Sequence, residues 1–106
     1  MVKKTYQIKN LVKKYKAILL NNNIKPEKII LYGSFAYGKP KEWSDIDLVV
    51  IAKSFGNINP ITRMEFLSQK AAEVDDSLEV LGYTTKEFNG TKDSIFKEII
   101  QKGKEI

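Results

Sequence analysis

The sequence predicts a single α/β (α+β) domain in which a small mixed sheet of three or four strands is flanked by helices. Its 106 residues fit one domain, spanning 1–106, and 42% hydrophobic residues supply a core. Short apolar runs bounded by Pro, Gly or Asp alternate with longer segments of helical periodicity, in the order α-β-α-β-α-β-α. This alternation predicts a compact sheet covered by helices.

The first half of the chain predicts two helices and two strands. Residues 5–22 are expected to form an amphipathic helix, which Pro26 keeps from continuing. Residues 28–32 form an apolar run that predicts a buried strand, and one helical turn is expected to open at Ser34. A second strand is expected over 45–52, the most hydrophobic stretch of the chain. The apolar face of the first helix is expected to contain Leu11, Tyr15, Ile18 and Leu19.

The second half predicts two more helices around a third strand. A helix is expected to start at Pro60 and to run to residue 74, followed by a turn at 75–77 and a strand over 78–83. Thr84 and Glu87 have the spacing of a capping box. The helical stripe from residue 60 onward comprises Ile61, Met64, Leu67, Ala71 and Val74. A final helix is expected to be capped by Thr91, to bury Ile95, Phe96, Ile99 and Ile100, and to end at Gly103.

Composition excludes several kinds of chemistry. The chain has no cysteine and no histidine, which excludes disulfides, zinc clusters and Ser-His or Cys-His catalysis. Any metal site must consist of oxygen ligands, which favours Mg²⁺ or Mn²⁺. The net charge of +5 suits a protein with some affinity for phosphates but does not establish nucleic-acid binding. Without a leader-like or membrane-spanning run, the expected location is cytoplasmic.

Two segments contain the residues that are suited to catalysis or to metal binding. Asp45 and Asp47 are separated by one residue at the start of a predicted strand, so both side chains should project from the same face. Adjacent carboxylates repel each other and resist burial, and a divalent cation between them relieves both costs. Gly33 and Ser34 follow the preceding strand, where a glycine allows close backbone approach and a helical turn presents N–H groups to a phosphate. Together the segments are suited to metal-assisted phosphoryl chemistry.

Gly33 and Ser34, ten intervening residues, and then Asp45, Ile46 and Asp47 resemble the GS-x10-DxD signature of the DNA polymerase beta-like nucleotidyltransferase superfamily. The short chain resembles the minimal nucleotidyltransferase (MNT) branch of that superfamily. Members of this branch are often paired with a HEPN-domain toxin and act as its antitoxin. The resemblance covers most of the chain, and it implies the nucleotidyltransferase fold.

The resemblance also implies roles for individual residues. Gly33 and Ser34 would bind the triphosphate of ATP or another nucleoside triphosphate, and Asp45 and Asp47 would hold two Mg²⁺ ions. The third carboxylate of the family is usually Asp, and the matching position here is Glu79, as a catalytic residue and metal ligand. The implied reaction transfers a nucleoside monophosphate, AMP from ATP, to a hydroxyl of a HEPN-domain partner protein.

The sequence is compatible with several alternative functions and residue roles. Because Glu79 replaces Asp, the domain is also compatible with a catalytically weakened antitoxin that acts by binding its partner. A module that binds nucleic acid rests on the net charge alone, and the oligomeric state, a homo-oligomer included, is undetermined. Glu79 is equally compatible with a solvated strand residue. Tyr37 and Trp43 are compatible with stacking on a base or with ordinary packing.

Overall fold

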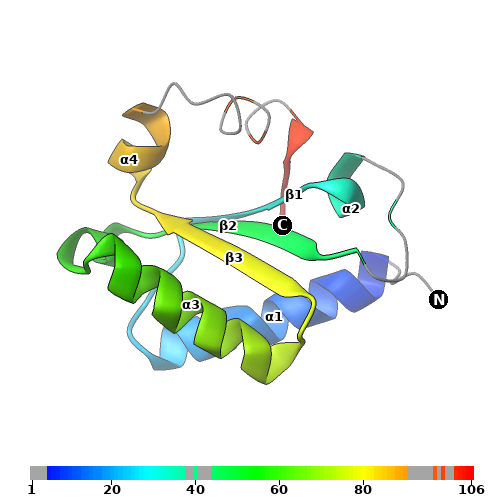
Figure 1. Cartoon of the computed structure of the whole chain (residues 1–106), viewed down its shortest axis with the longest axis horizontal. Coiled ribbons are helices and arrows are strands. Elements are labelled where there is room, and N and C mark those ends of the chain that lie inside the picture. Colours follow the sequence, from blue (N-terminus) through cyan, green and yellow to red (C-terminus); the bar gives the residue numbers. More distant parts are fainter. Residues whose placement is uncertain (1–4, 38–39, 41–43, 91–96, 98, 100–101) are drawn as a thin grey trace.

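The computed structural model describes residues 5–37, 40, 44–90, 97, 99 and 102–106. Its elements follow in the order α1 (Thr5–Asn21), β1 (Lys28–Tyr32), α2 (Ser34–Tyr37), β2 (Ile46–Ile51), the 3-10 helix η1 (Lys53–Asn57), α3 (Pro60–Val74), β3 (Leu78–Tyr83), α4 (Thr85–Gly90) and β4 (Lys104–Glu105). The predicted mixed sheet flanked by helices is confirmed (Figure 1). In the described part of the chain, no helix is long and apolar enough to cross a bilayer.

The sheet has four strands in the order β3-β2-β1-β4. β1 is antiparallel to both of its neighbours, β2 and β4, whereas β2 and β3 are parallel. The parallel pair is connected through η1 and α3, because a parallel connection must return the chain to the same end of the sheet. β2 is therefore a central strand, and its first residues lie between the end of β1 and the start of β3.

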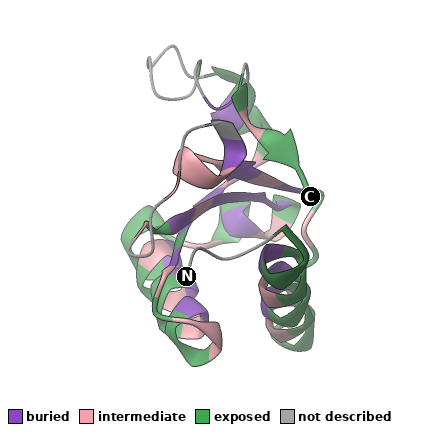
Figure 2. Cartoon of the chain, turned by 90° about the vertical axis from the view of Figure 1, so that its right-hand side faces the viewer, coloured by how far each residue is buried: buried purple, intermediate pink, exposed green. Residues whose placement is uncertain are grey.

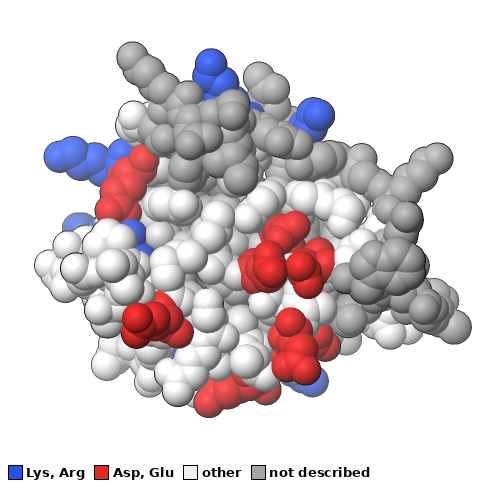
Figure 3. All heavy atoms as spheres, in the orientation of Figure 1, with Lys and Arg blue, Asp and Glu red and all other residues white. Residues whose placement is uncertain are grey.

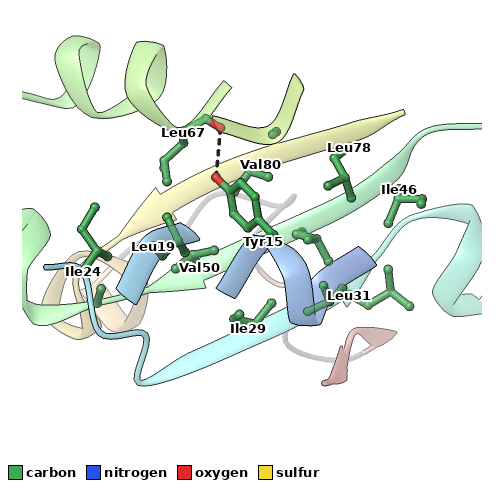
Figure 4. Close-up of a cluster of buried hydrophobic side chains, with 14 of the residues drawn as sticks. Tyr15, Leu19, Ile24, Ile29, Leu31, Ile46, Val50, Leu67, Leu78 and Val80 are labelled. Atoms are coloured by element: carbon green, nitrogen blue, oxygen red, sulfur yellow. Dashed lines mark hydrogen bonds between the residues drawn. The ribbon is translucent and has the colours of Figure 1, made fainter. Parts of the chain in front are cut away.

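α1 and α3 cover one face of the sheet (Figures 1 and 2). Alternate residues of β1, β2 and β3 point into this layer and form the larger hydrophobic cluster with both helices (Figure 4). Tyr15 lies at its centre, fully buried, and its hydroxyl donates a hydrogen bond of 2.9 Å to the carbonyl of Leu67. Burial raises the pKa of the Tyr15 phenol, which therefore stays protonated at any ordinary pH.

The opposite face of the sheet is covered only in part. Val49 and Ile51 of β2 pack there with Phe88 of α4 and with Ile99. This second cluster occupies the end of the sheet toward which β2 and β3 run. Asp47 precedes Val49 by two residues and lies on the same face, beyond the residues that form this cluster. The polar end of this face is where the candidate site lies.

The helical faces differ in detail from those that the sequence predicts. In α1 the buried residues are Ile8, Val12, Tyr15 and Leu19, whereas the predicted Leu11 and Ile18 are only half-buried. In α3, Leu67 and Ala71 are buried as predicted, but Ile61 is 70% exposed. Ile99 is buried, and the other predicted core residues of the final helix lie outside the described residues, as does Thr91. The predicted range of three or four strands allowed for β4, but its position was not predicted.

The predicted capping box is present at the start of α4. The backbone N–H of Thr84 donates to Glu87 Oε1 at 2.8 Å, and the N–H of Glu87 donates to the Thr84 hydroxyl at 3.1 Å. Glu87 also forms a 2.8 Å ion pair with Arg63, which is 4% exposed. Arg63 donates further hydrogen bonds to the carbonyls of Phe55, Ile58 and Gly82. This arginine therefore joins η1, α3, β3 and α4.

Candidate active site

Asp45 and Asp47 lie where β2 begins. Asp45 directly precedes the strand and is exposed, and Asp47 is its second residue and half-buried. Between them Ile46 is fully buried in the opposite layer, as is Leu48 after them. This alternation places both carboxylates on the face that α1 and α3 do not cover, as expected from the spacing.

Glu79 lies beside Asp47 on the adjacent strand. The parallel register pairs Asp47 with Glu79, while the neighbouring Leu78 and Val80 point into the buried layer. Glu79 interacts with both aspartates through charge and through side-chain hydrogen bonds. The structure thus brings together the three carboxylates Asp45, Asp47 and Glu79, referred to below as the acidic cluster.

The electrostatics of the acidic cluster are unfavourable for three ionised groups. Burial first, and then the charges of Glu79 and Asp45, raise the pKa of Asp47 to about 6. Partial desolvation, followed by the charge and hydrogen bond of Asp45, raises the pKa of Glu79. Carboxylates that share hydrogen bonds must retain a proton between them, since an ionised carboxylate is an acceptor only. A divalent cation can replace such a proton and stabilise the ionised forms.

The turn after β1 lies against Asp47. Gly33 has φ +76°, in the left-handed region that favours glycine, and a Cβ at this position would overlap the Asp47 carboxylate. Ser34 then begins α2, and the N–H of Ala36 donates to the Gly33 carbonyl at 3.0 Å. A group bound at this turn is thereby placed next to the carboxylates, with no side chain of residue 33 intervening.

Tyr32 is a neighbour of the cluster that sequence reasoning missed. The antiparallel register pairs it with Asp47, so one cross-strand row contains Glu79, Asp47 and Tyr32. Tyr32 is half-buried and packs partly against the second hydrophobic cluster. The sequence does not define the register of β1 against β2, so only the position of Tyr32 directly before Gly33 indicates that it lies near the acidic cluster. Trp43 and the side chain of Tyr37 lie outside the described residues.

The donor set fits a magnesium ion that is shared with a phosphate ligand. Among the described residues, no three His, Cys, Asp or Glu side chains are already arranged to hold a metal ion. Mg²⁺, however, is usually bound through one or two carboxylates together with substrate phosphates and water. Asp45 and Asp47 supply two carboxylates of that kind, and the Gly33 turn provides space for a phosphate. Figure 3 shows acidic atoms gathered near the centre of this side of the molecule.

Comparison with known proteins decides the family. Residues 7–106 match the family model described as polymerase beta, nucleotidyltransferase. The chain belongs to the polymerase beta nucleotidyltransferase family. The resemblance stated on the GS-x10-DxD pattern is therefore confirmed, and so is the fold that it implied. No curated protein matches this nucleotidyltransferase domain by sequence.

The solved structures that resemble the domain include chains of toxin–antitoxin complexes. One is a chain of a toxin–antitoxin complex with AMP-PNP, with 27% identity, TM-score 0.63, and coverage of 91% of this domain and 69% of that chain. Another comes from a complex of the tri-AMPylated HEPN toxin of Shewanella oneidensis with its MNT antitoxin, with 25% identity, TM-score 0.54, and coverage of 90% and 70%. A nucleotidyltransferase-like protein of Sulfolobus solfataricus, at 21% identity, TM-score 0.54 and coverage of 88% and 86%, shares the fold.

Proposed function

We propose that this domain transfers a nucleoside monophosphate, AMP from ATP, to a hydroxyl of a partner protein in a Mg²⁺-dependent reaction. The partner is a HEPN-domain toxin, and the domain is its antitoxin. The observation that carries the proposal is the position of the acidic cluster directly against the Gly33 turn. Phosphoryl chemistry requires mainly positioning and charge neutralisation, and this arrangement is suited to both.

Each residue of the site has a distinct proposed role. Asp45 and Asp47 bind two Mg²⁺ ions, and Gly33 and Ser34 bind the triphosphate. Bound magnesium neutralises phosphate charge and lowers the pKa of the attacking hydroxyl. Glu79 is the third carboxylate, beside Asp47 on the adjacent strand, and accepts the proton of that hydroxyl.

The proposed reaction is balanced without any further reactant. The acceptor oxygen forms a bond to the α-phosphorus of ATP, and the bond between that phosphorus and the bridging oxygen of the β-phosphate breaks. Pyrophosphate leaves, and the hydroxyl proton moves to the Glu79 carboxylate. Metal ions held by Asp45 and Asp47 would neutralise the triphosphate, and Gly33 and Ser34 would orient it so that the attacking and leaving oxygens lie in line.

The structural neighbours support the choice of ATP as the substrate and of a HEPN toxin as the partner. One of them is in a complex with AMP-PNP, an ATP analogue, and another belongs to a complex in which a HEPN toxin is tri-AMPylated. The acidic cluster and the Gly33 turn of this domain have the residue types that such a transfer requires. AMP is therefore the nucleotide and a protein hydroxyl the acceptor in our proposal.

The proposal is tested by incubating the domain with its proposed HEPN-domain partner, Mg²⁺, and ATP labelled at either the α- or the γ-phosphate. We expect α-label on the HEPN protein and γ-label only in pyrophosphate. Asp47→Asn should abolish transfer, whereas Asp76→Asn should leave it unchanged, because Asp76 is an exposed turn residue with the same charge. Transfer that survives Asp47→Asn would refute the site.

A second candidate function is silencing of the partner by binding alone. Two points favour it: the family resemblance implies an Asp where this chain has Glu79, and the acidic cluster is not arranged as a three-ligand metal site. The labelling experiment separates the two functions. A tight complex with the HEPN protein, without transfer by the unchanged domain at any Mg²⁺ concentration, would support binding and contradict the transferase.

A further inference from the structure

A groove lies between α1 and β4, at the edge of the sheet. It has a volume of about 620 Å³ and combines residues of the first helix with the last two residues of the chain. Figure 2 shows the C-terminal end of the chain beside a helix of the layer below the sheet. Because β4 is the outermost strand, one of its sides pairs with β1 and the other faces away from the sheet. We refer to this feature as the α1–β4 groove.

Apolar side chains converge in the α1–β4 groove. Tyr6 is 61% exposed and Ile106 is 37% exposed, and both line it together with Val12. These two account for half of the four exposed large hydrophobic residues in the described chain. Exposed apolar residues that gather in one concave surface are typical of binding sites, whereas isolated ones need no explanation.

The same groove is strongly cationic. Lys9, Lys13 and Lys16 line it on successive turns of α1, and Glu105 is its one acidic residue among the described ones. This sign is opposite to that of the acidic cluster on the other face of the sheet. A partner that fills the groove should therefore carry carboxylates opposite the lysines and apolar side chains opposite Tyr6 and Ile106.

We propose that the α1–β4 groove is the docking surface for an acidic segment of the protein that accepts the nucleotide, an inference that rests on the transferase function proposed above. A nucleic acid would meet the three lysines and the ring of Tyr6, but Glu105 repels phosphates and Ile106 offers no face for stacking, so RNA binding is made an outcome of the test. A second copy of the domain is less suitable, since a symmetric contact through this groove would bring like charges together.

The position of the groove also suits a docking role. β4 and β2 are separated by β1 alone, so two strand spacings, roughly 10 Å, separate them. Lys104 pairs with Leu31, which pairs with Leu48, the residue after Asp47. A partner held at this edge can reach the acidic cluster with a neighbouring part of its chain. Docking and transfer then use separate surfaces on opposite faces of the sheet, which a partner connects by passing around the β4 edge.

Matched charge-reversal variants test this inference. The groove variant is Lys9→Glu, Lys13→Glu and Lys16→Glu. The control variant reverses the exposed Lys25, Lys53 and Lys86, which line hollows elsewhere, and therefore changes the net charge equally. We expect the groove variant to weaken binding of the proposed HEPN-domain partner at least tenfold and the control variant less than threefold. Thermal unfolding of both variants verifies that they fold.

Three outcomes would overturn the docking proposal. Equal weakening by both variants would indicate non-specific attraction, and unchanged binding by the groove variant would exclude the groove. A groove variant that loses affinity only for a 15-nucleotide single-stranded RNA would identify a nucleic-acid surface instead. Since the chain has no cysteine, Tyr6→Cys carrying a photo-crosslinker gives an independent measurement, with Thr62→Cys as the exposed control on α3. We expect cross-links to the HEPN protein only from position 6.

Failure of docking and failure of the transferase can be distinguished. If the unchanged domain transfers α-label and the groove variant does so with an unchanged KM for the HEPN protein, docking is wrong and the transferase stands. If the unchanged domain transfers nothing but its complex depends on Lys9, Lys13 and Lys16, the transferase is wrong and the groove remains the docking surface. The proposal predicts a KM raised at least tenfold in the groove variant, with little change in kcat.

Discussion

Replacing Asp47 by Asn should stabilise the metal-free protein at neutral pH while it abolishes activity. Burial and two neighbouring carboxylates raise the pKa of Asp47 from 3.8 to about 6, so its ionisation is unfavourable in the folded state. A shift of about 2 units corresponds to about 3 kcal/mol as an upper limit. Solvent screening of this half-buried group reduces the expected gain to about 1–2 kcal/mol.

The sign of the pH dependence follows from the raised pKa. The folded state holds the Asp47 proton more tightly than the unfolded chain does, so the stabilisation is complete below the unfolded pKa. It is lost as the pH rises through about 6. Asp47→Asn has no proton to lose at this position. The variant should therefore match the unchanged protein at pH 3.5 and exceed it at pH 7.5.

Urea unfolding in the presence of EDTA measures the difference at both pH values. At pH 7.5 the variant should also melt several degrees higher, since about 1 kcal/mol shifts Tm by roughly 4–8 °C in a domain of this size. Mg²⁺ should stabilise the unchanged protein and have little effect on Asp47→Asn. Asp76→Asn, in an exposed turn, is the control and should show neither effect. A variant that is less stable than the unchanged protein at pH 7.5 would refute the reasoning.

Three further substitutions test the fold and the site. Gly33→Ala should cost about 1–3 kcal/mol and abolish transfer, because φ +76° is strained for alanine and its Cβ overlaps Asp47. Arg63→Met should cost at least about 3 kcal/mol in urea unfolding, since several buried carbonyls lose their donor and each costs about 1–3 kcal/mol. Tyr15→Phe should cost about 0.5–1.5 kcal/mol through loss of the hydrogen bond to the Leu67 carbonyl, which keeps its partner within α3, with transfer unchanged. Full transfer by Gly33→Ala, or stability losses below 0.5 kcal/mol (roughly the range of surface substitutions) in the other two, would contradict these accounts.

The sequence predicts the site more completely than the helical packing. Period-two alternation placed Asp45 and Asp47 on one face, and the alternation of Glu79 with Leu78 and Val80 agrees with the structure. The strand register then brings Glu79 beside Asp47, which the family resemblance had implied. The capping box of Thr84 is local as well, and local patterns depend on few residues.

The features that the sequence did not predict depend on contacts between distant segments. Arg63 is buried because carbonyls from η1 and β3 surround its guanidinium, and nothing in its own helix indicates this. Ile61 lies in the first turn of α3 and is exposed, whereas Leu67 and Ala71 farther along the helix are buried. β4 has two residues and depends on pairing with β1 and on the hydrogen bond from the Ile106 N–H to the Ile29 carbonyl. A strand this short has no periodicity to detect.

The central claim is that Asp45 and Asp47 bind a divalent cation together with the triphosphate held at Gly33 and Ser34. It is tested most directly by crystals grown with Mn²⁺ and a non-hydrolysable ATP analogue, with anomalous scattering used to locate the metal. The account predicts anomalous peaks in contact with both aspartates and phosphate density at the Gly33 turn. Nucleotide bound elsewhere, or a triphosphate at the turn with no metal at Asp45 and Asp47, would contradict it.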